Sequence, residues 1–110
     1  MNIDYLFYRR PAKPGPYSLD DLGEVTPAIG PGPTVRAGIQ RLFDQLDWRE
    51  SGDVPGAWFA TGGPVFQLTE ENNGEVTSLM GSHLEPYQML RLVHAMGLIA
   101  LDLQRDIVFA

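Results

Sequence analysis

Histidine is the side chain whose ordinary pKa best suits proton transfer near neutral pH, and this sequence has two. The first, His83, forms an H-x-E pair with Glu85, the arrangement in which zinc deaminases place a metal ligand and a proton shuttle. Those enzymes also need a P-C-x-x-C pair, and the chain has no cysteine. The interval between His83 and His94 fits no standard zinc-ligand spacing either. We therefore expect neither a metal site nor a cofactor.

A second arrangement could serve proton transfer without a metal. Tyr87, Arg91 and His94 share one face of a predicted helix, so His94 could act as a general base in a groove. His83 lies just before this helix, so a ligand-binding or catalytic pocket could be formed by His83, Tyr87 and His94. We call this the alternative pocket. The sequence contains no nucleophile elbow or dinucleotide-binding loop, and no carboxylate pair whose spacing fixes a general acid and base. A protein without catalytic activity is favoured, and a small enzyme or ligand-binding domain is the alternative.

Acidic residues are the stronger signal. The 110 residues include 14 Asp and Glu against 8 Lys and Arg, a formal net charge of −6. This excess opposes nucleic-acid binding, which depends on basic surface, and suits either ordinary solubility or a basic protein partner. The acids gather in two stretches, one after the first predicted helix and one at a predicted hairpin tip. The candidate partner-binding residues are Asp44, Asp47, Trp48, Glu50, Asp53, Glu70, Glu71 and Glu75.

These features favour a small acidic interaction protein without catalytic activity. In size and acidity the chain resembles the acidic immunity proteins of bacterial toxin systems, a likeness that covers no defined motif and assigns no residue a role. The resemblance implies an inhibitor that occupies and blocks a basic partner. Complementary charge would speed the encounter and buried aromatic side chains would supply affinity, with Trp48, Trp58 and Phe59 as candidates. A structural homo-oligomer joined through an open sheet face, such as a homodimer, is a further alternative.

The hairpin is the clearest structural signal. Asn73-Gly74 suits the two central positions of a type I′ turn, where both residues need positive φ. With that turn Asn72 faces Glu75, and further along Leu68 pairs with Leu79. Because successive side chains point to opposite faces, the strands divide into two sets. The buried set is Phe66, Leu68 and Leu79, and the open set is Val65, Gln67, Thr69, Ser78 and Met80.

The remaining pattern predicts the fold class. Apolar spacing predicts a helix from Thr34, its N-cap, through Leu46, and a second helix from Pro86 to a stop at Gly97. This order favours an α+β two-layer sandwich, a mainly antiparallel sheet of four to six strands with both helices on one face. A ferredoxin-like variant, βαββαβ with an extra strand, is an alternative. Besides the hairpin, strands are predicted at residues 1–10, 57–60, 98–103 and 107–109.

We expect one domain spanning residues 1–110. Residues 11–33 form a long loop rich in proline and glycine, with one helical turn begun by Ser18. A loop of this length is either a functional element or a passive connector. No stretch approaches the roughly 20 apolar residues that span a membrane, and the first residues do not form a signal peptide. We therefore expect a cytoplasmic protein that does not bind membranes.

Overall fold

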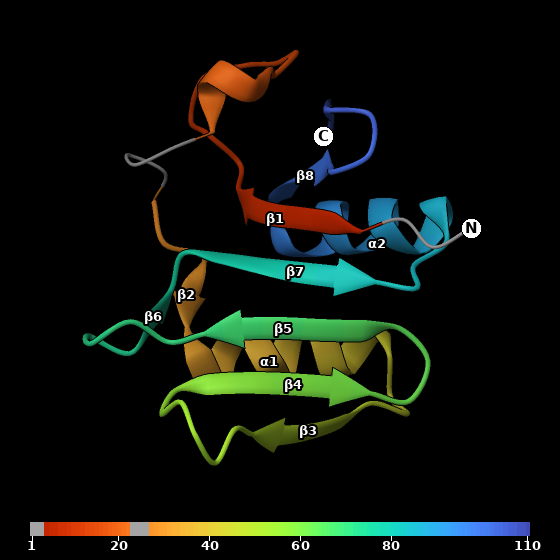
Figure 1. Cartoon of the computed structure of the whole chain (residues 1–110). Helices are drawn as coiled ribbons and strands as arrows, with labels where there is room; N and C mark the ends of the chain where they lie inside the picture. Colours follow the sequence, from red (N-terminus) through yellow and green to blue (C-terminus); the bar gives the residue numbers. More distant parts are fainter. Residues whose placement is uncertain (1–3, 23–26) are drawn as a thin grey trace.

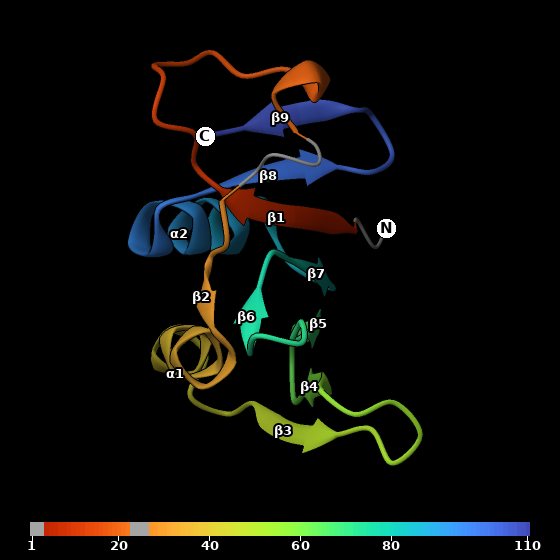
Figure 2. The same cartoon turned by 90° about the vertical axis from the view of Figure 1, so that its left-hand side faces the viewer.

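The computed structural model describes residues 4–22 and 27–110. The main strands are β1 (Tyr5–Arg9), β3 (Asp47–Glu50), β4 (Ala57–Thr61), β5 (Val65–Thr69), β7 (Ser78–Ser82), β8 (Leu98–Asp102) and β9 (Ile107–Phe109), and the helices are α1 (Gly32–Leu42) and α2 (Pro86–Met96). Within the described residues these seven strands form one antiparallel sheet in the order β3-β4-β5-β7-β1-β8-β9 (Figure 1). Both helices lie on the same face, α1 beside β4 and β5, and α2 beside β1 and β8 (Figure 2).

The predicted α+β class with both helices on one face is therefore confirmed. The predicted number of strands is wrong, because the described part of the sheet has seven rather than four to six. The added strand is β3, whose residues Asp47–Glu50 are mostly charged and carry no apolar alternation. The chain also departs from the βαββαβ plan, since β3, β4, β5 and β7 all lie between the helices where that plan has two strands.

The core lies between the sheet and the helices. The predicted inward side chains Phe66, Leu68 and Leu79 are buried, together with Tyr5 and Phe7 of β1. In β1, β5 and β7 every second residue points into this core, as the pleat requires, whereas all five residues of β8 are buried. The helices contribute their apolar stripes to the same core: Val35, Ile39, Met89, Leu92 and Val93.

The first helix starts and stops earlier than predicted. It begins at Gly32 after Pro31, so Thr34 lies inside it rather than capping it. Proline suits the first turn of a helix, where its missing N–H costs nothing, and Pro33 occupies that turn. The helix ends at Leu42, yet Phe43 beyond it is still buried. The apolar spacing therefore identified the buried face correctly but not the ends of the helix.

The second helix agrees with its predicted ends. Pro86 is its first residue, and Gly97 ends it in the left-handed conformation, at φ 64°. Glu85 precedes the helix, and its backbone N–H donates to the Gln88 side chain at 2.8 Å. This bond satisfies one of the donors left free at a helix start.

The hairpin keeps its predicted register but not its predicted turn. Leu68 faces Leu79 as expected. At the tip, however, the Glu71 N–H donates to the Glu75 carbonyl and the Gly74 N–H donates to the Glu71 carbonyl, both at 2.8 Å. Gly74 has φ 82°, whereas Asn73 is not among the described residues with positive φ. The turn is thus a three-residue loop of residues 72–74 with a glycine bulge, and the type I′ prediction is wrong.

A small second sheet explains this offset. β6 (Glu75–Val76) leaves the hairpin and pairs with β2 (Gly30–Pro31), next to the start of α1. One extra residue on the returning side then restores the Leu68–Leu79 pairing. The hairpin tip is therefore shaped by a contact with a distant segment.

The helical turn predicted after Ser18 in the loop of residues 11–33 is confirmed. It is the 3₁₀ turn η1 (Leu19–Asp21), and the Ser18 backbone N–H donates to the Asp21 carboxylate at 2.7 Å. Hydrogen bonds from Lys13 and then Ser18 hold the pKa of Asp21 below its ordinary value. The loop also supplies β2 and the first two residues of α1, while residues 23–26 lie outside the described residues.

Two further predictions concern the first strand and membrane-spanning segments. Of the strand predicted at residues 1–10, β1 covers Tyr5–Arg9, and residues 1–3 lie outside the described residues. In the described parts of the chain, no helix has both the length and the hydropathy required to span a bilayer.

Candidate binding surface

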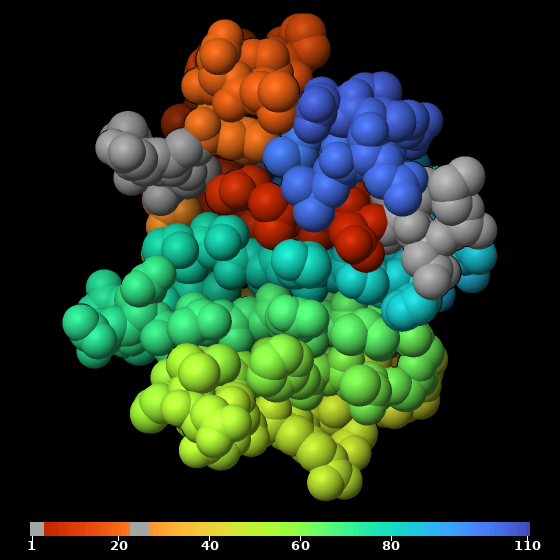
Figure 3. All heavy atoms as spheres, viewed as in Figure 1, coloured from red at the N-terminus to blue at the C-terminus, as the bar shows by residue number. Residues whose placement is uncertain are grey.

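The face of the sheet opposite the helices carries a row of side chains that crosses four strands. Phe59 of β4 faces Gln67 of β5, Gln67 faces Met80 of β7, and Met80 faces Leu6 of β1. Phe59 is 40% exposed. Figure 3 looks onto this face, and the strands β4, β5 and β7 reach the surface there. We call Leu6, Phe59 and Met80 the apolar row.

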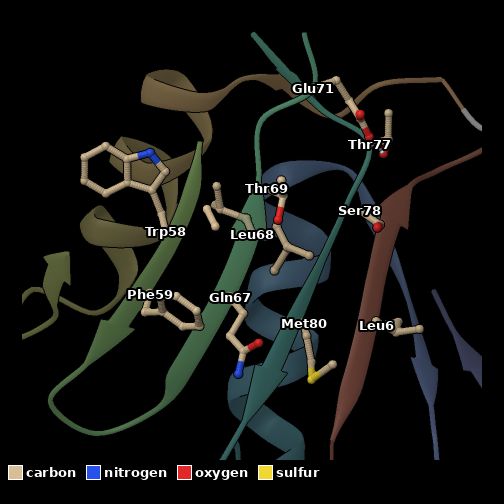
Figure 4. Close-up of a pocket in the computed structure, with 12 residues that line it drawn as sticks. Leu6, Trp58, Phe59, Gln67, Leu68, Thr69, Glu71, Thr77, Ser78 and Met80 are labelled. Atoms are coloured by element: carbon tan, nitrogen blue, oxygen red, sulfur yellow. Dashed lines mark hydrogen bonds between the residues drawn. The ribbon is translucent and has the colours of Figure 1, made fainter. Parts of the chain in front are cut away.

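A hollow of about 240 Å³ lies over this row (Figure 4). Its other end is polar and is lined by Thr69, Thr77, Ser78 and Glu71. The Thr77 hydroxyl donates to the Glu71 Oε1 atom at 3.5 Å, which leaves the Glu71 Oε2 atom for another donor. The hollow thus runs from an apolar floor to a single carboxylate.

Several of the predicted partner-binding acids gather at the same end of the sheet. The loop of residues 51–56 lies beside the hairpin tip, because the Glu70 N–H donates to the Gly56 carbonyl at 2.9 Å (Figure 1). We call four of these residues the acidic end: Glu50, Asp53, Glu71 and Glu75. Within the described parts of the chain, none of the four lies within ion-pair distance of a basic side chain.

Not all of these carboxylates are equally free. Glu50, Asp53 and Glu71 are exposed, but Glu50 pairs with Trp58 and so lies on the helix side of β3. The Glu50 carboxylate accepts the Gly56 N–H at 3.1 Å, and one oxygen of Glu75 is buried without a hydrogen-bond partner among the described residues. Asp53 and Glu71 are therefore the carboxylates best placed to meet another molecule.

Glu70, by contrast, is occupied within the chain. Its Oε1 atom lies 2.5 Å from the Arg36 Nη1 atom, and the Arg36 guanidinium lies 3.8 Å from the centre of the Trp58 ring. Glu70 approaches so closely that a side chain at Gly32 would collide with it. This contact joins α1 to the hairpin, and no spacing in the sequence indicates it.

The other predicted partner-binding residues lie elsewhere. Asp44 follows the C-terminal end of α1, and Asp47 begins β3, where its carboxylate pairs with Arg49 at 3.1 Å. Trp48 is half-buried, packs against the core, and keeps a buried indole N–H without a partner among the described residues. Its ring faces the helices rather than the hollow, because it pairs with the buried Ala60.

The alternative pocket residues lie along α2 and at the turn before it. His83, Tyr87 and His94 are all exposed, Tyr87 by 68%. They line neither the hollow on the open face nor a second hollow between Leu19 and Ile107, at the β9 edge. In the described part of the chain, no group of three His, Asp or Glu side chains could hold a metal ion.

One charged cluster lies outside the hollow, at the β1–β8 pair. Burial would raise the pKa of Asp102, but hydrogen bonds from the Arg105 side chain at 2.8 Å and from two backbone N–H groups hold it below its ordinary value. Tyr5 faces Asp102 across the strand pair. Burial raises the pKa of the Tyr5 hydroxyl, and the Asp102 carboxylate raises it further.

Comparison of this chain with protein-family models, with curated proteins and with solved structures found no match.

Sequence reasoning anticipated part of the surface and missed part. It placed Gln67, Thr69, Ser78 and Met80 on the open face and named Phe59 as a candidate anchor. It missed Leu6, because nothing local indicates that β1 lies beside β7.

Proposed function

We propose that this chain is a non-catalytic interaction protein that binds a basic protein through the open face of its sheet. The observation that carries the proposal is that the acidic end adjoins the hollow over the apolar row, because Glu71 belongs to the acidic end and also lines the hollow. Apolar surface next to unpaired charge of one sign suits a partner that presents both apolar and basic side chains.

The two parts of the surface would contribute differently. The carboxylates would steer a basic partner toward this end of the sheet and speed association. The apolar row would supply most of the affinity, since buried aromatic and large apolar side chains dominate binding energy. A partner held there would be covered over part of its own basic surface, which is how an immunity or inhibitor protein blocks an active site.

A binding experiment with matched variants tests this function. The tagged chain is used to capture a partner from a lysate of the cells that produce it, and the purified pair is studied by calorimetry at several salt concentrations. We expect the double variant Asp53→Asn, Glu71→Gln to bind about fivefold more weakly at low salt, with the difference shrinking as salt rises.

The control is the double variant Asp44→Asn, Asp106→Asn, which removes the same charge from exposed positions away from the acidic end. It should bind like the unmodified chain. Equal weakening by both variants would show that net charge alone matters. Capture of the chain by itself, with a native mass of twice the monomer, would support the homodimer instead.

A further inference from the structure

The structure also indicates what the partner presents. We propose that the hollow is a two-part site for one extended segment, in which an apolar side chain rests on the apolar row and an arginine reaches Glu71. This inference rests on the proposed function and specifies the chemistry of its contact.

The separation between the row and Glu71 suits two side chains of one segment. Gln67 lies between Phe59 and Met80 of the apolar row. Glu71 follows Gln67 by four residues, and at about 3.3 Å per residue the two are separated by roughly 13 Å. Side chains two residues apart in an extended segment point to the same face and lie about 7 Å apart. The long stem of an arginine covers the remaining distance. The fitting segment therefore carries an arginine two residues from an apolar residue.

The polar end of the hollow suits a cation. Its hydroxyls, from Thr69, Thr77 and Ser78, can accept the extra N–H groups of a guanidinium, and Glu71 supplies the charge. No basic residue lines the hollow as described. Arg49 lies opposite Phe59 on this face and is exposed, but its charge is offset by Asp47 at 3.1 Å.

The opposite face already shows the same chemistry. There Arg36 lies between the Trp58 ring and the Glu70 carboxylate. Glu70 turns toward the helices and Glu71 toward the open face, so neighbouring residues provide one carboxylate to each side. On the open face, the position that corresponds to Arg36 has no basic side chain from the described residues.

Other ligand classes fit less well. Pockets for small molecules usually enclose about 300–1,000 Å³, and this hollow is smaller and open. A phosphate or a nucleic acid would meet Glu71 and the other carboxylates of the acidic end, which repel it. A short peptide segment meets the hollow without either difficulty.

The test needs no knowledge of the partner. The probe is the peptide acetyl-RGLGR-amide, which places an arginine two residues from leucine in both chain directions. We expect titration followed by NMR to shift the methyl signals of Leu6 and Met80 and the amide of Glu71. A peptide with citrulline in place of both arginines should bind at least about threefold more weakly, because citrulline keeps the shape but loses the charge.

Matched variants place the two parts of the site. Phe59→Ala and Glu71→Gln should each weaken binding of the arginine peptide, and Glu71→Gln should remove its preference over the citrulline peptide. The controls Tyr87→Ala and Asp106→Asn change an exposed aromatic and an exposed acid elsewhere and should leave binding unchanged. Equal affinity for both peptides, or shifts confined to α2 or β9, would overturn the inference.

The two proposals fail separately. If the arginine peptide does not bind but Asp53→Asn, Glu71→Gln still weakens the captured partner, the proposed function stands and the two-part site is wrong. If the peptide binds with the expected preference, the site stands even when no partner is captured.

Discussion

Glu70 and Glu71 show how one residue of offset separates a structural role from a binding role. Glu70 meets Arg36 beside α1, whereas Glu71 lines the hollow on the other side of the sheet. In the sequence the two are equivalent members of an acidic hairpin tip. Strand alternation predicts that the two side chains point to opposite faces. Only the fold shows that Arg36 lies on the helix side, where it pairs with Glu70.

The contact of Arg36 with Glu70 and Trp58 should stabilise the fold. Arg36→Ala leaves Glu70 half-buried without its partner and uncovers one face of the Trp58 ring. We expect the free energy of unfolding to fall by about 1–3 kcal/mol, measured by urea denaturation. Arg41→Ala, exposed on the same helix, should change it by less than about 0.5 kcal/mol. Similar losses from both variants would contradict a specific role for the contact.

Asp102 should make stability depend on acid. The ordinary pKa of this carboxyl is 3.8, and folding lowers it. The folded chain therefore binds fewer protons at this group than the unfolded chain does. The stabilisation is complete above about pH 4 and is lost as pH falls through the lower, folded value. We expect Asp102→Asn to flatten the loss of unfolding free energy as pH falls below about 4. A slope identical to that of the unmodified chain would show that other carboxylates govern acid unfolding.

Among the secondary-structure elements, the apolar pattern correctly predicted the features that depend on neighbouring residues of the chain. The register of β5 with β7 follows from the burial of Phe66, Leu68 and Leu79, since a slip of one strand by one residue would expose either Leu79 or the pair Phe66 and Leu68. The turn itself did not follow from its own residues. Asn73-Gly74 suits a two-residue turn, but pairing of β6 with β2, about 45 residues earlier in the chain, selects a longer loop.

The end of α2 offers a test of one such local force. Gly97 has φ 64°, a conformation that disfavours a side chain, and an added Cβ would meet no other atom within 4 Å. Gly97→Ala should therefore cost about 1 kcal/mol through the backbone alone. Gly52→Ala is the matched control, because Gly52 also lies in open space but lacks positive φ. Thermal unfolding of both variants compares them, and equal melting temperatures would refute the backbone explanation.

At the scale of the whole molecule, the order of the strands in the sheet could not be predicted from the sequence. The hairpin strands pair with their chain neighbours, but β1 lies between β7 and β8. No turn or periodicity connects such distant segments. This placement brings Leu6 beside Met80 and so completes the apolar row, which explains why the open face was predicted only in part.

Position in the sheet should govern the cost of losing a side chain. Phe7 of β1 is fully buried in the middle of the sheet, whereas Ile107 of the edge strand β9 is 43% exposed. Phe7→Ala should lower the free energy of unfolding by about 3–5 kcal/mol, and Ile107→Ala by less than about 1 kcal/mol. Chemical denaturation measures both. Comparable losses would mean that β9 is as central to stability as β1.

The central place of β1 also has a consequence during synthesis. Residues 5–9 leave the ribosome before β7, which begins at Ser78, and before β8, which begins at Leu98. Both edges of β1 therefore stay unpaired until those two strands have been made. Contacts of such long range slow folding, and an aromatic strand with free edges is prone to pair with other chains. A nascent chain of this protein should therefore depend on chaperones until β8 emerges.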